Sequence, residues 1–135
     1  MNIIITLPMN LWEKIISGEK TIELRKVTPR NFNCSTDKCY VILKDTDILA
    51  GWIYLDSIKT CPKTEPITAD IETRVAVSRS WIDNYLAKSN RYSLWYIRNH
   101  ENHYDLESAR QLFCIRSNPQ SYIYTNVNLK YTELA

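Results

Sequence analysis

The chain has 135 residues, a length that predicts one domain, residues 1–135, with a single hydrophobic core. Hydrophobic residues make up 44% of it and charged residues 24%, a composition that excludes intrinsic disorder and low-complexity chains. Seventeen Lys and Arg against fifteen Asp and Glu leave a net charge of +2. This charge is too small for the whole molecule to attract nucleic acid, so any such contact must use a local basic patch.

Several classes of site are not expected. The four cysteines follow no CxxC spacing, and no apolar stretch is long enough for a signal peptide or a membrane span, so we expect a cytoplasmic protein with no membrane contact. The two glycines form no phosphate-binding loop or nucleophile elbow, and no cofactor is expected. His100 and His103 are spaced as possible metal ligands, but without an identifiable third ligand we interpret them as part of a polar loop and expect no metal.

The first elements follow from apolar periodicity. Ile3–Leu7 is β-branched and predicts a strand, and Met9–Ser17 predicts a helix that begins after Pro8. Gly18 suits a left-handed helix end. The alternating run Lys20–Val27 predicts a half-buried strand. The apolar stripe of the helix comprises Leu11, Trp12, Ile15 and Ile16.

The rest of the chain predicts a mixed architecture. The strands expected are Cys39–Leu43 and Gly51–Ile58, paired as a hairpin, then Tyr92–Arg98 and Tyr122–Val127. The helices expected are Ala69–Val77, one beginning at Ser80 with a buried stripe of Trp81, Ile82, Tyr85 and Leu86, and a short one in Asp105–Gln111. Asn99–Asp105 is expected to be a loop. This order predicts an α+β fold, with antiparallel strands in a small barrel or curled sheet that has flanking and inserted helices.

The most informative segment is SGEKTIELRK, residues 17–26. It places a glycine, Lys20, Glu23 and Arg25 at fixed offsets, G-x-K-x-x-E-x-R, directly after an amphipathic helix. This arrangement resembles the ASCH domain family of the PUA-like superfamily. The resemblance implies a PUA-like β-barrel whose cleft holds RNA or a modified nucleoside.

The resemblance also implies an alternative, enzymatic function. Some small ASCH-like proteins are amidohydrolases that act on an N4-acetylcytidine-type nucleoside, with a Lys, a Thr three residues later and a distant Glu; others are linked to RNA cleavage. Lys20 matches the Lys, but Glu23 stands at the Thr position, so Lys20 and Glu23 are candidate catalytic residues only if the protein is a hydrolase. The distant acid has three candidates: Glu65, Asp70 and Glu72.

Four cations within eleven residues predict a basic strip that could position phosphates: Lys20, Arg25, Lys26 and Arg30. Strand alternation assigns Lys20 to the face of Ile22 and Leu24, with Glu23 and Arg25 opposite. We therefore expect that only a bulge would bring all three charged groups to one face.

Two further segments are candidate ligand contacts. Tyr92 and Trp95, separated by Ser93 and Leu94, could stack bases, although the core is the more frequent place for any single aromatic residue. Gln120 and Ser121 offer an amide and a hydroxyl, just before the aromatic pair Tyr122 and Tyr124. The sequence thus predicts binding of RNA or a nucleotide-like ligand, with a hydrolase or a regulatory interaction module as the alternatives.

Overall fold

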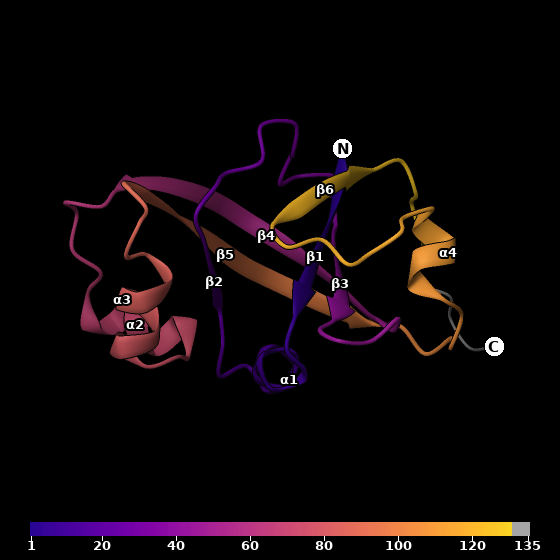
Figure 1. Ribbon diagram of the computed structural model, residues 1–135, viewed down its shortest axis with the longest axis horizontal. Helices are drawn as coiled ribbons and strands as arrows, with labels where there is room; N and C mark the ends of the chain where they lie inside the picture. The colour runs from indigo at the N-terminus through magenta and orange to yellow at the C-terminus, as the bar shows by residue number, and fades with distance from the viewer. Residues whose placement is uncertain (131–135) are drawn as a thin grey trace.

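The computed structural model describes residues 1–130 and contains one six-stranded sheet in the order β2-β5-β4-β3-β1-β6 (Figure 1). The pairing of β1 with β3 is parallel and the other pairings are antiparallel. The strands are β1 (Asn2–Leu7), β2 (Ile22–Arg25), β3 (Cys39–Leu43), β4 (Leu49–Pro62), β5 (Arg91–Asn102) and β6 (Tyr122–Thr125). The predicted α+β class is confirmed.

Four helices flank the sheet in the described residues: α1 (Met9–Ser17), α2 (Ala69–Val75), α3 (Arg79–Tyr85) and α4 (Ala109–Phe113). The helix α1 ends at Gly18, whose φ of 83° confirms the predicted left-handed cap. The N-cap of α3 is Ser78, whose hydroxyl accepts a hydrogen bond from the Trp81 amide, and not Ser80 as the sequence suggested. In Figure 1, α2 and α3 lie together at the end of the sheet opposite α4.

The closed barrel expected from the sequence is not formed, because no backbone ladder joins β2 to β6 in the described chain. Instead the sheet curls, and the Arg25 side chain lies across its open side. Its guanidinium donates to the Thr6 carbonyl of β1 and to the Ser121 carbonyl just before β6, both at 3.2 Å. A side chain thus occupies the place where a closed barrel would need a strand pairing.

The long strands β4 and β5 form the back of the curled sheet. They pair from Gly51–Asn102 to Pro62–Arg91, so β5 takes up the first part, residues 99–102, of the segment expected to be a loop. Two register shifts, on either side of Leu55, bend this ribbon. Residues of both β1 and β2 line a hollow of the curled sheet.

One cluster of buried residues lies between the outer face of β1, β3 and β4 and the helix α4, and another fills the inside of the curled sheet. Leu11, Trp12 and Ile15 of α1 pack into it, whereas Ile16, predicted to be buried, is 41% exposed at the end of the stripe. The helices α2 and α3 cover β2 and one end of β5 with Val75, Ile82 and Leu86. Within the described residues, no helix is both long and apolar enough to cross a membrane.

Candidate functional site

The conspicuous feature of the motif is a buried ion network. Lys20 Nζ lies 3.2 Å from Glu23 Oε1, while Glu23 Oε2 accepts from Arg25 Nε at 3.1 Å and from its terminal nitrogen at 2.9 Å. The three residues are only 2%, 4% and 8% exposed. A carboxylate between two cations is the arrangement that makes burial of three charges tolerable.

Lys20 has its hydrogen-bonding capacity filled by the protein. Besides Glu23, its ammonium donates to the Ile22 carbonyl at 2.8 Å and to the Val75 carbonyl at 2.9 Å. Val75 is the last residue of α2, so Lys20 satisfies a carbonyl that the helix leaves unpaired. The motif lysine therefore joins the α1–β2 turn to α2.

The network keeps Glu23 and Arg25 charged. Burial alone would raise the pKa of Glu23, but the charges of Lys20 and Arg25 and their hydrogen bonds outweigh it and hold that pKa below its ordinary value. Burial alone would lower the pKa of Arg25, but the Glu23 carboxylate raises it. At neutral pH the site thus contains a fixed carboxylate and a fixed guanidinium.

The expectation that Lys20 and the Glu23–Arg25 pair occupy opposite faces is wrong. The strand β2 begins only at Ile22, so Lys20 lies in the preceding turn, where alternation does not apply. The pairing of β2 with β5 is regular, from Ile22–Tyr96 to Arg25–Ser93, and needs no bulge. All four β2 residues are buried, because α2 and α3 cover the face of Ile22 and Leu24, whereas the opposite face of the strand lies inside the curled sheet, where Arg25 packs over Trp95.

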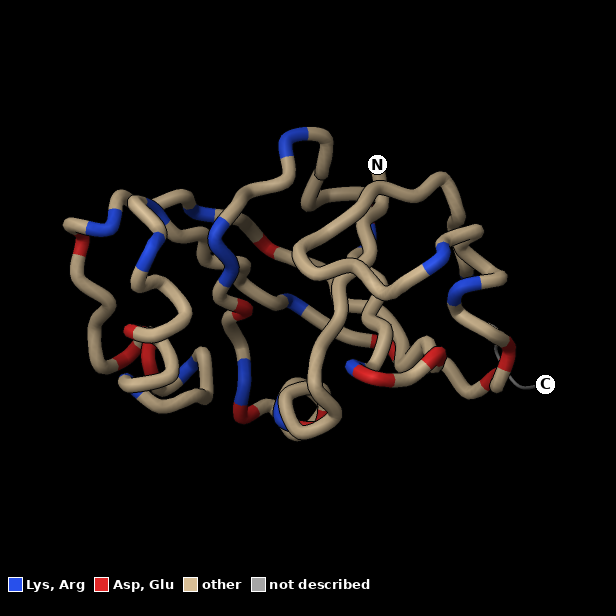
Figure 2. The backbone as a smooth tube through the Cα atoms, viewed as in Figure 1, with Lys and Arg blue, Asp and Glu red and all other residues tan. Residues whose placement is uncertain are grey.

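Glu23 and Arg25 form part of the floor of a cleft of about 950 Å³. The cleft lies between β1, α1, α3 and the segment that precedes β6. Its charged lining in the described chain consists of four cations and two carboxylates: Lys14, Arg25, Lys44, Arg110, Glu23 and Asp45. The two charged lining residues from β2, Glu23 and Arg25, cancel each other, and Figure 2 shows acidic and basic positions alternating in this region. The excess positive charge of the cleft therefore comes from residues of other elements.

An aromatic pair on α3 forms one wall of the cleft. Trp81 and Tyr85 are stacked, with ring centroids 4.9 Å apart and an interplanar angle of 20°. Lys26 Nζ lies over the Tyr85 ring at 4.7 Å. Trp81 is 43% exposed, although its helix stripe predicted burial. It is the aromatic side chain of this wall with the larger free surface, and sequence periodicity alone misassigned it to the core.

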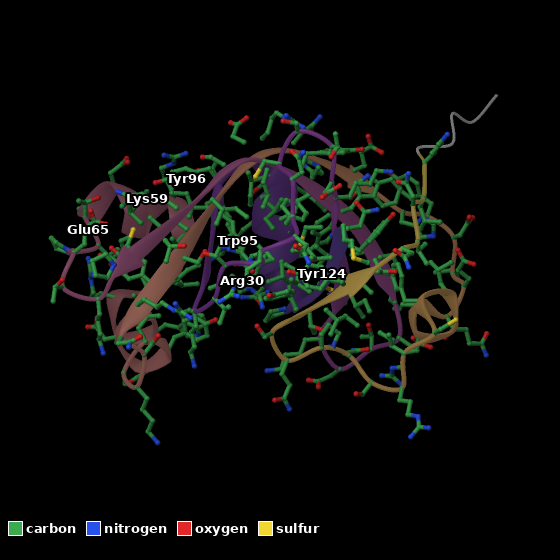
Figure 3. All side chains as sticks on the ribbon, turned by 90° about the horizontal axis from the view of Figure 1, so that it is seen from above. Arg30, Lys59, Glu65, Trp95, Tyr96 and Tyr124 are labelled. Carbon is green, nitrogen blue, oxygen red and sulfur yellow. The ribbon has the colours of Figure 1, made fainter. Side chains whose placement is uncertain are left out.

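The predicted stacking residues Tyr92 and Trp95 are not available to a ligand. They are 1% and 0% exposed, and Tyr92 donates to the Glu65 carbonyl at 2.9 Å. Trp95 lies near the middle of the molecule (Figure 3), below the Arg25 guanidinium, and its indole donates to Ser93 Oγ at 2.9 Å. Ser93 itself is fully buried. All three belong to the interior because β5 is a central strand, covered on both faces.

Other predicted positions lie at the surface. Gln120 is exposed and lines the cleft, and exposed Ser121 supplies the carbonyl that Arg25 contacts. The four-residue basic strip does not form one patch: Lys20 and Arg25 are buried, and Lys26 contacts Tyr85. Arg30 is exposed and precedes Asn31, whose amide donates a hydrogen bond to the Tyr124 hydroxyl of β6.

The candidate distant acids do not line this cleft in the described structure. Glu65 pairs with Lys59 at 3.4 Å and Glu72 with Arg79 at 3.1 Å, both near the molecular surface. Asp70 is exposed in the first turn of α2. A residue that the sequence did not single out, Thr6, does line the cleft, and its buried hydroxyl oxygen has no hydrogen-bond partner within residues 1–130.

The fold is an α+β domain in which a curled sheet and its flanking helices border a cleft. No family model and no curated protein matches the chain. Among solved structures, the ASCH protein of Zymomonas mobilis matches with a TM-score of 0.77 and 16% identity, over 93% of this chain and 87% of that one. Its serine-to-alanine and tyrosine-to-phenylalanine variants match equally, with TM-scores of 0.77 and 0.76, 16% identity and the same coverage of this chain, over 88% and 90% of theirs. This chain therefore has the ASCH fold, which confirms the predicted resemblance at the level of the fold.

Proposed function

We propose that this chain binds single-stranded RNA or a nucleotide-like ligand in the cleft above Glu23 and Arg25. The observation that carries the proposal is the half-exposed Trp81 on a wall of a net positive cleft. Proteins hold unpaired bases by stacking them on aromatic faces next to cations that contact phosphate. The structural similarity to an ASCH protein supports the same class of ligand.

The parts of the cleft suggest separate roles. A base stacks on Trp81, and phosphate lies toward the exposed Lys44 and the half-buried Arg110 on the other side. The Thr6 hydroxyl and the Gln120 amide offer hydrogen bonds to a base or ribose edge. Lys20 and Glu23, whose charged groups already contact each other, maintain the floor instead of binding the ligand directly.

Fluorescence anisotropy with a labelled single-stranded RNA tests this proposal. Replacing Trp81 by Ala should weaken binding by about 5- to 150-fold, since one stacked base contributes about 1–3 kcal/mol. Replacing Lys44 by Ala should reduce the salt dependence of binding by about one phosphate contact. Tyr104→Ala, which removes a more exposed aromatic ring outside the cleft, is the matched control and should bind normally. Wild-type affinity in Trp81→Ala would refute the proposal.

The alternative function is hydrolysis of an acetylated nucleoside or of RNA in the same cleft. Its supporting observation is that the cleft floor contains a buried carboxylate, Glu23, in contact with Arg25 of the floor and with Lys20, which does not itself line the cleft. Lys20, however, is engaged with three acceptors, a state suited to fixing a charge and unsuited to nucleophilic attack. We expect no product from N4-acetylcytidine or short RNA after incubation with the pure chain. Product that forms with the wild type and is lost with Glu23→Gln, compared at a temperature where both are folded, would favour the hydrolase.

A further inference from the structure

A second group of chemically competent side chains lies outside the cleft, in residues 103–107 between β5 and α4. His103, Asp105 and Glu107 alternate along this segment, and each presents one donor atom within 4.8 Å of the other two. These residues are absent from the cleft lining. The sequence interpretation of a plain polar loop did not include the two carboxylates as partners for His103.

The imidazole of His103 is enclosed yet incompletely bonded. Its side chain is 12% exposed, and its ring lies 6.1 Å from that of Trp52. The Nε2 atom is buried and has no hydrogen-bond partner in the described part of the chain. The nearest acidic atom, Glu107 Oε1, is 3.5 Å away. A buried nitrogen without a partner is costly, which points to a group that the protein alone does not supply.

The backbone holds the segment at both ends. At its start, the His103 amide donates to the Ala50 carbonyl at 2.9 Å. At its end, the Ala109 and Arg110 amides donate to the carbonyl and carboxylate of Asp47, at 3.1 and 2.8 Å. The carboxylates of Asp105 and Glu107 therefore extend from a short, anchored loop, so bringing them together with His103 requires little ordering of the backbone.

We propose that His103, Asp105 and Glu107 form a zinc site. One imidazole and two carboxylates are zinc ligands, and three protein ligands leave the fourth tetrahedral position to water. With metal–ligand distances of about 2.0–2.2 Å, donor atoms in such a site lie about 3.4 Å apart, close to the His103–Glu107 separation of 3.5 Å. The exposed side chain of Asp105 rotates to bring its carboxylate oxygen from within 4.8 Å of the other two donor atoms to the shorter separation of a zinc site. The imidazole favours zinc over magnesium or calcium, which prefer oxygen ligands alone.

The second histidine provides a matched control. His100 is also partly buried, but its ring packs edge-on against Trp12, at 6.1 Å and 84°, and it is not part of the cluster. His100 lies in β5 and His103 directly follows it, so a change from His to Gln at either position removes an imidazole from the same part of the fold. Only the change at position 103 removes a proposed zinc ligand.

Isothermal titration of the full chain with zinc chloride, under reducing conditions, tests the site. We expect one zinc per chain for the wild type and for His100→Gln, with affinity lowered more than about tenfold in His103→Gln, because even outer partners of metal ligands contribute 10- to 100-fold. The double variant Asp105→Asn/Glu107→Gln should show the same loss. Since these two carboxylates are exposed, the double variant tests the proposal even if His103→Gln does not fold.

Cobalt substitution distinguishes this site from binding at cysteines. The chain has four free cysteines, of which Cys114 is exposed and Cys34 partly so. Cobalt held by His103 and the two carboxylates should show visible bands without the intense near-ultraviolet absorption of a thiolate–cobalt bond. Thiolate absorption, absence of one-to-one zinc binding, or wild-type affinity in the double variant would each overturn the proposal.

Discussion

Glu23 connects both cations of the buried network, so its neutralisation is the sharpest perturbation that the structure offers. Glu23→Gln preserves the size of the side chain and one oxygen acceptor but removes the negative charge. Lys20 and Arg25 then remain at 2% and 8% exposure with no carboxylate between them. The two cations would also repel each other in a region that water reaches poorly.

The expected loss of stability follows from the depth of the site. Removing one partner of a buried ion pair costs about 3–5 kcal/mol, because the remaining charge keeps its desolvation penalty. The amide of Gln retains part of the hydrogen bonding, so we expect a value near the lower limit, about 3 kcal/mol. For a domain of this length, that corresponds to a decrease of about 10 °C in the melting temperature.

Urea unfolding followed by tryptophan fluorescence measures this loss directly. The matched control is Glu65→Gln, which removes a carboxylate that pairs with Lys59 at the surface, at 3.4 Å with both side chains about half exposed. The control should leave the unfolding midpoint unchanged within error. If Glu23→Gln unfolds at the same urea concentration as the control, the network does not stabilise the fold and the reasoning is refuted.

Three further predictions concern pH and packing. The pKa of Glu23 lies below the ordinary 4.5, so its charge contributes stability that is present above pH 4.5 and is lost as the pH falls through the folded-state pKa. The difference in unfolding free energy between wild type and Glu23→Gln should therefore shrink in acid. A difference that stays constant with pH would contradict this. Trp12→Ala should cost about 3–5 kcal/mol in urea unfolding, because the ring is 5% exposed inside the core, and a loss below 1 kcal/mol would argue against that packing. Gly51→Ala should lower the melting temperature and the amide-exchange protection of β4 and β5, because a Cβ there would lie 1.9 Å from the Glu101 carbonyl oxygen; unchanged exchange would contradict this close approach.

Local sequence signals determined most of the elements. The helix Met9–Ser17 and the strand Cys39–Leu43 have the predicted bounds. The helix is marked by an apolar stripe that ends before the cap residue Gly18, and the strand by a continuous apolar run, and both signals depend only on neighbouring residues. The segment of residues 17–26 also identified the ASCH fold that the solved structures share. Strand ends were less accurate, because β5 extends to Asn102 only through its pairing with β4.

The site itself was decided by tertiary structure. Lys20 meets Glu23 because a turn replaces strand geometry before Ile22, and no alternation rule contains that information. Trp81 is half exposed and Trp95 fully buried, although both fit an apolar pattern, because their burial depends on which elements cover them. A sequence determines which residues are apolar or charged along one element, whereas a cleft, an ion network and an open sheet edge arise only when separate elements pack together.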